Sequence, residues 1–292
     1  MAGEQANLEE LRRRIDEIDT ELQDLLIQRI DVTRRIGAAK KGSRTFIRPG
    51  REAQVLRRLL QRHRGPLPKA VIVRIWREIF SAVTGLQGPL KIAVLAENAN
   101  AGICRLAAEH FGSRTPIQAL GSVSQVLNAM IHEEGTLGVL PLPQGDEAQA
   151  WWPGLAREGE GVPRVIARLP FMEAPADRFG VAGALVLGLL EAEDSGCDRS
   201  FLVVETETEL SRSRLRGFLD TAGLVPVDMQ SRLEGGARWL HLIEVEGCVG
   251  EMPRGVKRLT DAAGDAVCQV WPIGGYAAPL TSKELALAEE TV

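Results

Sequence analysis

The stretch Leu8–Ile36 reads LEELRRRIDEIDTELQDLLIQRIDVTRRI, and it decides how the N-terminal part of the chain folds. Its apolar residues recur three and four positions apart, which is typical of a helix that buries one face against other helices. These residues are Leu8, Leu11, Ile15, Ile18, Leu22, Leu25, Val32 and Ile36. Arg29 interrupts the series at a position where an apolar side chain is expected. A buried guanidinium needs an anion, and no acid follows at a suitable spacing in the helix, so we predict that a ligand supplies it.

Helix breakers divide the first 88 residues into three predicted helices. The first runs from residue 8 to about 41, the second from about 51 to 63, and the third from 69 to about 87. Gly65-Pro66 separates the second from the third, and Gly88-Pro89 ends the third. The apolar stripe of the third helix comprises Ile72, Ile75, Trp76, Ile79, Phe80 and Val83. Gln87 continues the same face, four residues after Val83.

From Leu90 the hydrophobic period changes to an α/β pattern. We expect a strand over 91–95, a helix over 101–111 and a strand over 138–142, with further apolar segments at 165–169 and 182–190. The last part then reads strand (201–204), helix (211–222), strand (225–229), strand (239–245), helix (254–263) and strand (267–271). This βαββαβ order is the ferredoxin-like arrangement.

Composition excludes several classes of protein. The chain has 292 residues, 45% of them hydrophobic, and a net charge of −4, which fits an ordinary soluble protein of two or three domains and not a nucleic-acid binder. We expect no targeting segment, no membrane span and a cytoplasmic location. The four cysteines are scattered without a CxxC pair or a histidine cluster, so no metal site, disulfide framework or cofactor is predicted.

Helix geometry constrains how the charged residues of the first helix act together. Arg29 and Lys40 are eleven residues apart, so they share a face at about 16 Å and can grip a small dianion from both ends. Arg12 precedes Arg29 by 17 residues, or about 25 Å along the axis, and lies on another face. One small substrate cannot touch both arginines of one chain. If Arg12 belongs to a site, it belongs to the site of a partner chain, which predicts an interlocked dimer.

The charged positions and helix breaks together resemble the all-helical chorismate mutase family over residues 8–88. The resemblance rests on Leu11-Arg12-Arg13-Arg14-Ile15-Asp16-Glu17-Ile18-Asp19, Gln28-Arg29, Ile36-Gly37-Ala38-Ala39-Lys40, Arg51-Glu52, Ile75-Trp76-Arg77-Glu78-Ile79-Phe80 and Gln87. The order of the three parts is similar to that of bifunctional chorismate mutase–prephenate dehydratases, whose third part is an ACT regulatory domain.

The resemblance implies a multidomain protein. Its N-terminal domain is all-α, a three-helix fold that forms an intertwined dimer. A truncated α/β region of the prephenate dehydratase type follows, and then an ACT-like, ferredoxin-like α+β domain. The predicted boundaries are 1–88, 89–200 and 201–280, with a tail at 281–292.

The resemblance also implies an activity, the intramolecular [3,3] rearrangement of chorismate to prephenate in aromatic amino acid biosynthesis. Arg12 of the partner chain and Arg29 are then assigned to the two substrate carboxylates. Lys40 and Gln87 are assigned to the ether oxygen. Glu52 is assigned to the substrate hydroxyl.

Three further residues are expected to bind substrate. Arg51 is expected to hold or neutralise Glu52. Arg48 stands where the family commonly has an aspartate, and Val83 where a small hydroxyl residue often lines the pocket.

The tail departs from the dehydratase signatures. Ala96-Glu97-Asn98-Ala99-Asn100-Ala101 stands where a Gly-Pro-Glu-Gly loop is usual, and Asp198-Arg199-Ser200-Phe201 where a Thr-Arg-Phe triplet is usual. The span from 90 to 201 is also too short for a two-lobed domain, so we predict that one lobe and its cleft are missing. In the ACT-like part, Gln230-Ser231-Arg232-Leu233 replaces Glu-Ser-Arg-Pro, which leaves an amino-acid effector open.

Three functions remain as alternatives at this point. The chain is a chorismate mutase with a degenerate tail, a bifunctional chorismate mutase/prephenate dehydratase, or a non-catalytic regulatory subunit that retains a chorismate site. Taken singly, each charged residue has an ordinary structural explanation. Arg29 alone indicates a buried ion pair or a register-setting residue, and Lys40 alone a favourable helix C-terminus. The five catalytic candidates in register favour the mutase.

Overall fold

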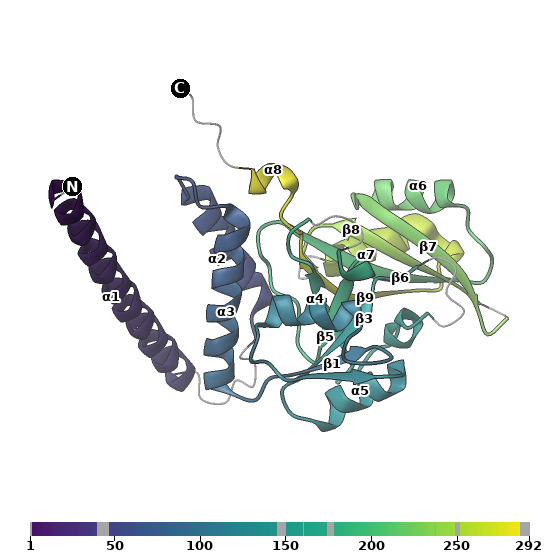
Figure 1. Ribbon diagram of the computed structural model, residues 1–292. Helices are drawn as coiled ribbons and strands as arrows, with labels where there is room; N and C mark the ends of the chain where they lie inside the picture. Colours follow the sequence, from purple (N-terminus) through teal and green to yellow (C-terminus); the bar gives the residue numbers. More distant parts are fainter. Residues whose placement is uncertain are drawn as a thin grey trace.

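The computed structural model describes residues 2–39, 47–144, 150–159, 161–173, 178–236, 238–248 and 252–286. Three helices come first, α1 (Ala2–Ala39), α2 (Pro49–Arg62) and α3 (Lys69–Gln87), as the sequence predicted. α2 and α3 lie side by side against the rest of the molecule, whereas α1 extends away from them and approaches only the C-terminal end of α3 (Figure 1).

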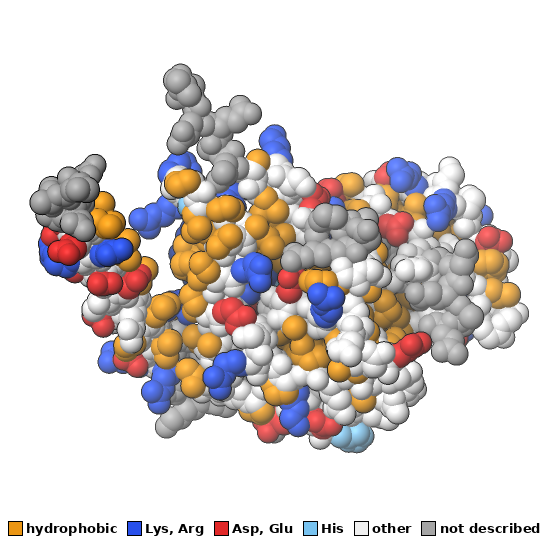
Figure 2. Space-filling model, viewed as in Figure 1, with side chains coloured by type: hydrophobic (Ala, Val, Ile, Leu, Met, Phe, Trp, Pro, Cys, Tyr) orange, Lys and Arg blue, Asp and Glu red, His pale blue; other side chains and the backbone are white. Residues whose placement is uncertain are grey.

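The apolar stripe of α1 is uncovered within the chain. Its eight predicted seam residues, from Leu8 to Ile36, are each between 42% and 59% exposed. Hydrophobic side chains also gather on the surface over α2 and α3 (Figure 2), and Ile75 and Leu86 of α3 are 45% and 61% exposed. The predicted helix therefore forms, but its expected burial requires a surface that this chain does not provide.

The strands that the structure describes form one nine-stranded mixed sheet in the order β2-β1-β3-β5-β4-β9-β6-β8-β7. The first five strands are β1 (Lys91–Leu95), β2 (Ile117–Leu120), β3 (Thr136–Pro141), β4 (Arg164–Leu169) and β5 (Ala184–Gly188). α4 (Gly102–Phe111) and α5 (Val123–His132) connect the parallel strands β1, β2 and β3, while the 3-10 helix η1 (Trp152–Leu155) and β5 add to the same half. Ser122 caps α5 by accepting a hydrogen bond from the amide of Gln125. The sequence analysis missed β2 and α5.

The C-terminal half of the sheet has the predicted βαββαβ order. It consists of β6 (Asp198–Thr206), α6 (Arg212–Ala222), β7 (Pro226–Glu234), β8 (Arg238–Glu246), α7 (Met252–Ala263) and β9 (Gln269–Ala277). β9, β6, β8 and β7 are antiparallel neighbours, and α6 and α7 pack on one face, so the ferredoxin-like prediction is confirmed. Short helices η2 (Arg178–Gly180), η4 (Gly264–Ala266) and α8 (Ser282–Leu285) complete the described elements.

Gly274 joins the two halves of the sheet. β4 and β9 pair in parallel where Val165 faces Gly274. Gly274 has a φ of +117°, and a Cβ there would lie 2.2 Å from the carbonyl oxygen of Val165. Only glycine combines this backbone conformation with so close an approach. The middle region and the ferredoxin-like region therefore share one continuous sheet, although the predicted boundary at residue 200 was placed between them on sequence alone.

A shared core also fixes α2 and α3 to the sheet. Leu56, Leu60 and Phe80 pack in one buried cluster with Phe171 and Leu280 of the C-terminal part. Among the described residues, no helix combines the length and apolarity needed to cross a bilayer.

Leu56→Ala tests this shared core. Leu56 is fully buried, so truncation leaves a cavity and we expect the free energy of unfolding to fall by about 2–5 kcal/mol. Leu189→Ala, at a side chain that is 44% exposed, serves as the matched control and should change it by less than about 0.5 kcal/mol. Urea unfolding at one fixed protein concentration measures both. Equal effects would show that α2 does not pack on the sheet as described.

Candidate active site

Arg29 lies in the angle between α1 and α3. Its guanidinium carbon is 5.5 Å from the centre of the Phe80 ring, a cation–π contact that holds the side chain against α3. The Nη1 atom of Arg29 is buried and has no hydrogen-bond partner in the part of the chain that the structure describes. Burial lowers the pKa of Arg29, and the charge of Glu52 opposes this change. An arginine keeps its charge at neutral pH, so its buried donor remains available to an anion.

Gln87 reaches the same region from the end of α3. Its Nε2 atom donates to the carbonyl oxygen of Thr33 on α1 at 3.5 Å. A Cβ added to Gly37 would lie 3.8 Å from the Gln87 amide, so α1 passes close to this side chain. Arg29 and Gln87 therefore both lie where α1 meets α3.

Glu52 forms a buried ion pair with Arg77 of α3. The Nη1 atom of Arg77 donates to Oε2 of Glu52 at 2.7 Å, and the side chains are 6% and 21% exposed, respectively. Burial raises the pKa of the Glu52 carboxyl, the charges of Arg77 and Arg29 oppose the rise, and the nearby Glu193 carboxylate adds to it. The Arg29 charge thus acts on Glu52, which links α1 to α2 electrostatically.

A small cavity lies on the sheet side of this ion pair. Glu52 and Arg77 line it together with Phe80 and His110, and its volume of about 20 Å³ has room for a water molecule but not for an organic substrate. Burial lowers the pKa of His110 well below its usual value, and the charge of Arg77 lowers it further. His110 is therefore neutral beside the ion pair.

The other predicted substrate-binding residues have different surroundings. Val83 is buried on α3, whereas Arg48 and Arg51 are exposed at the start of α2. Arg51 donates to Gln54 at 3.1 Å, whereas the ion pair with Glu52 is made by Arg77 of α3. That Arg51 also holds or neutralises Glu52 stays a prediction. Lys40 lies outside the described residues.

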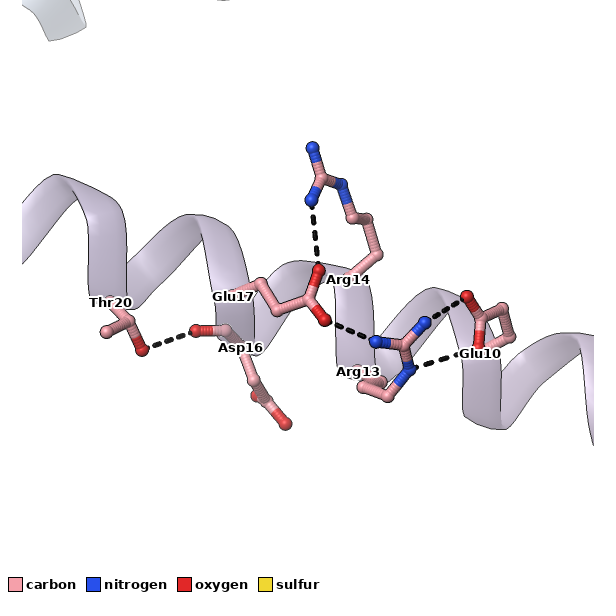
Figure 3. Close-up of polar contacts among 6 residues, drawn as sticks. All are labelled: Glu10, Arg13, Arg14, Asp16, Glu17 and Thr20. Carbon is pink, nitrogen blue, oxygen red and sulfur yellow. Dashed lines mark hydrogen bonds and ion pairs between the residues drawn. The ribbon is translucent and has the colours of Figure 1, made fainter.

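Arg12 is exposed on α1, 17 residues before Arg29 in one continuous helix. Its two arginine neighbours are engaged within the helix, since Arg13 binds Glu10 and Glu17, and Arg14 binds Glu17 at 2.9 Å (Figure 3). Arg12 is not part of this network. It directly follows Leu11, which puts it beside the exposed apolar seam rather than on it.

Sequence reasoning missed Arg77 as part of this site. The signal was available, because Arg77 follows Val73 by four residues and precedes Phe80 by three, and both are buried. A charge at a buried helix position was the same observation that singled out Arg29. Within the described chain, one trio of potential metal ligands gathers, Asp194, Asp198 and Cys248.

Comparisons with known proteins match the N-terminal helices to one family and about half of the chain to known enzymes. Residues 11–88 match the family described as chorismate mutase type II. The bifunctional chorismate mutase/prephenate dehydratase of Pseudomonas aeruginosa is 30% identical over 152 residues, which are 50% of this chain and 41% of that protein. The enzyme of the same description from Neisseria gonorrhoeae is 31% identical over 136 residues, 47% of this chain and 37% of that protein. The matches thus span about two fifths of the length of these relatives.

Among solved structures, the chain is similar to one titled "GqqA- a novel type of quorum quenching acylases", with 14% identity and a TM-score of 0.49 over 65% of this chain and 96% of that one. A prephenate dehydratase from Streptococcus mutans gives 16% identity and a TM-score of 0.45 over 65% and 99% of the two chains. At these identities and scores, the likeness implies no shared activity.

Arg77→Met tests the buried ion pair. Removing Arg77 leaves the Glu52 carboxylate buried without its cation, so we expect the free energy of unfolding to fall by about 3 kcal/mol. The double variant Arg77→Met/Glu52→Gln should recover much of this loss, because no charge remains to be neutralised. Arg74→Met, at an exposed position of the same helix, is the control. If Arg77→Met behaves like Arg74→Met in urea unfolding, the ion pair does not stabilise this junction.

Proposed function

We propose that this chain, whose residues 11–88 form a chorismate mutase type II domain, is a chorismate mutase. It is an isomerase of the intramolecular-transferase type that converts chorismate to prephenate in aromatic amino acid biosynthesis, on the route to phenylalanine. We place it in the cytoplasm, without a metal or cofactor.

The observation that carries this proposal is the buried Nη1 atom of Arg29, which has no partner among the described residues. An unpaired buried donor on a cation is costly unless a ligand satisfies it. Chorismate carries two carboxylates, and guanidinium groups bind carboxylates with two parallel hydrogen bonds. Arg29 therefore suits one carboxylate, and Arg12 of a partner chain suits the other.

The reaction needs few chemical groups. The rearrangement is unimolecular and involves no covalent intermediate and no proton transfer to or from the enzyme. Catalysis consists of holding the compact conformer and stabilising the charge that develops on the breaking ether. Gln87 is a neutral amide donor on the Arg29 side of the site, which suits the ether oxygen, and Lys40 is proposed as the second donor. Substrate binds on the side of Glu52 on which Arg29 acts, because the cavity on the other side is too small.

Glu52 is proposed to accept a hydrogen bond from the substrate hydroxyl. Its Oε2 atom is held by Arg77, which orients the carboxylate and leaves Oε1 for the ligand. Val83 contributes apolar contact, and Arg48 and Arg51 lie at the rim, where α2 begins. Arg77 acts through Glu52 and is thus a positioning residue.

A second copy of this chain is the proposed partner. The seam of α1 is too long and too apolar to remain in water, and an exposed patch of this size marks an association surface. Because Arg12 flanks that seam, covering the seam with another α1 brings Arg12 towards the site of the other chain. The dimer is thus proposed to contain two shared sites.

The tail is proposed to lack prephenate dehydratase activity. The five strands before residue 190 belong to one sheet, and the usual dehydratase residues are replaced at Ala96–Ala101 and at Asp198–Phe201. A bifunctional enzyme and a non-catalytic subunit that binds chorismate are the competing proposals, and phenylalanine control stays open.

A coupled assay distinguishes the three functions. We expect purified chain to consume chorismate and accumulate prephenate, with phenylpyruvate appearing only at the spontaneous acid-catalysed rate. Arg29→Ala should lower kcat/KM at least about 100-fold, the effect of losing one charge-stabilising group. Arg34→Ala, exposed on the same helix, should have little effect. Enzymatic phenylpyruvate formation supports the bifunctional enzyme, and no turnover by the wild-type chain contradicts the mutase.

Subunit mixing tests the shared site. Arg12→Ala and Arg29→Ala should each be inactive alone, but their heterodimer contains one intact site and one doubly defective site. Activity should therefore return after subunit exchange, verified by native mass spectrometry. Mixing Arg29→Ala with the double variant Arg12→Ala/Arg29→Ala is the matched control and should recover nothing. Equal activity in both mixtures would exclude a contribution of Arg12 in trans.

A further inference from the structure

The N-terminus of α2 lacks a capping side chain of its own. Its N-cap residue is Arg48, which makes no side-chain capping bond, and Pro49 follows at the first helical position. The first amides of a helix have no acceptor within the helix and need one from outside. Here the first turn carries Arg51 and Glu52, so the order of this turn decides where the site residue Glu52 lies.

Glu193, 142 residues further along the chain than Arg51, supplies the missing acceptor. Its Oε2 atom accepts a hydrogen bond from the backbone amide of Arg51 at 3.4 Å. Arg51 is the third helical residue, whose amide an N-cap side chain ordinarily binds. The Oε1 atom accepts from Nε of Arg48 at 2.6 Å. The carboxylate also faces the positive end of the helix dipole, which favours a negative charge there.

Gly50 makes this approach feasible. A Cβ at Gly50 would lie 2.7 Å from the backbone oxygen of Glu193 and 2.8 Å from its Cβ, closer than real Cβ atoms come. Gly50 is buried in the structure. Glycine here has a packing reason rather than a conformational one, because its φ lies outside the left-handed region.

Two more residues of α2 hold the same loop. Gln54 donates to the carbonyl oxygen of Asp194 at 3.0 Å. Arg57 donates to Oγ of Ser195 at 2.9 Å and to the carbonyl oxygens of Cys197 and Ala278 at 3.1 and 2.6 Å. Residues 50, 54 and 57 are spaced three and four apart, so one face of α2 docks on the segment that leads into β6.

From these contacts, we propose that Glu193 is a positioning residue of the mutase site. It caps α2 in place of the helix's own N-cap residue and keeps Arg51 and Glu52 in the arrangement that receives substrate. The inference rests on the proposed chorismate mutase function. It also assigns a role to the C-terminal part, which is to order the first turn of α2 before chorismate binds.

Glu193→Ala should raise KM for chorismate about fivefold and leave kcat within about twofold, because losing a cap lowers the fraction of molecules with an ordered first turn. Substrate binding then has to restore that turn, whereas the bound complex reacts as before. Glu193→Gln keeps an acceptor oxygen and should lie closer to the wild type. Glu191→Ala, at an exposed glutamate two residues earlier, is the matched control and should leave KM unchanged.

Gly50→Ala provides an independent test, because a local effect on the helix and the loss of the docking contact would change KM in opposite directions. Within an isolated helix, alanine is more favourable than glycine, so a purely local effect would strengthen α2 and leave KM unchanged or lower it. If the loop must dock, the added Cβ displaces Glu193 and KM should rise as in Glu193→Ala. Thermal unfolding of each variant verifies that it remains folded.

The outcomes separate the two proposals. If the wild-type chain turns over chorismate and both Glu193→Ala and Gly50→Ala keep its KM, the positioning role is overturned and the mutase stands. If the wild-type chain has no activity, the mutase proposal fails, and hydrogen exchange then tests the cap alone. Faster exchange of the amides in residues 50–56 of Glu193→Ala than of Glu191→Ala supports capping, and equal exchange rejects it.

Discussion

The uncovered apolar seam of α1 is the constraint on which the arrangement of the N-terminal part depends. A helix of 38 residues with an apolar stripe along most of its length has to bury it, yet all eight seam residues are exposed within the chain. If Arg12 and Arg29 serve one site as proposed, a single chain cannot complete it, because the half-buried Arg29 lies towards one end of the seam and Arg12 lies near the other. Under that proposal, association and substrate binding use the same surface.

Burial of charge gives the junction between the helices and the sheet its specificity. Arg77, Glu52 and Arg29 lie beside the buried apolar cluster that contains Phe80. Removing a charge from water costs free energy unless the charge is paired. Arg77 and Glu52 satisfy each other, while Arg29 keeps an unpaired donor. The contrast distinguishes an arginine held in an ion pair, Arg77, from one whose buried donor is available to the proposed ligand, Arg29.

The sequence predicted those features that depend on local periodicity. The three helices and the βαββαβ order were expected from the spacing of apolar residues and from helix breakers, and the structure confirms them. β2 and α5 were missed. The strand Ile117–Leu120 is short and has a mixed burial pattern, so the hydrophobic periodicity of this region is too weak to predict it. The joining of two sheets into one was also missed, because it depends on the pairing of Val165 with Gly274, which are more than a hundred residues apart.

The candidate site divides in the same way. Arg29, Glu52 and Gln87 could be predicted because each lies in a helix whose face is readable from sequence. Arg77 could have been found by the same criterion. The partner of Arg51's amide could not, because Glu193 is in a loop with no periodic signal. The contact exists only because the sheet carries that loop to the start of α2.

The C-terminal part then has a mechanical role whether or not it binds a ligand of its own. Glu193 and Ser195 precede β6, and β6 lies between β8 and β9 in the ferredoxin-like half of the sheet. Any change that shifts the start of β6 moves the carboxylate that caps α2. The first turn of α2 carries Glu52, so such a change reaches the site without altering any of its side chains. Regulation through this connection needs a ligand that distinguishes two positions of β6, since a ligand with equal affinity for both shifts nothing.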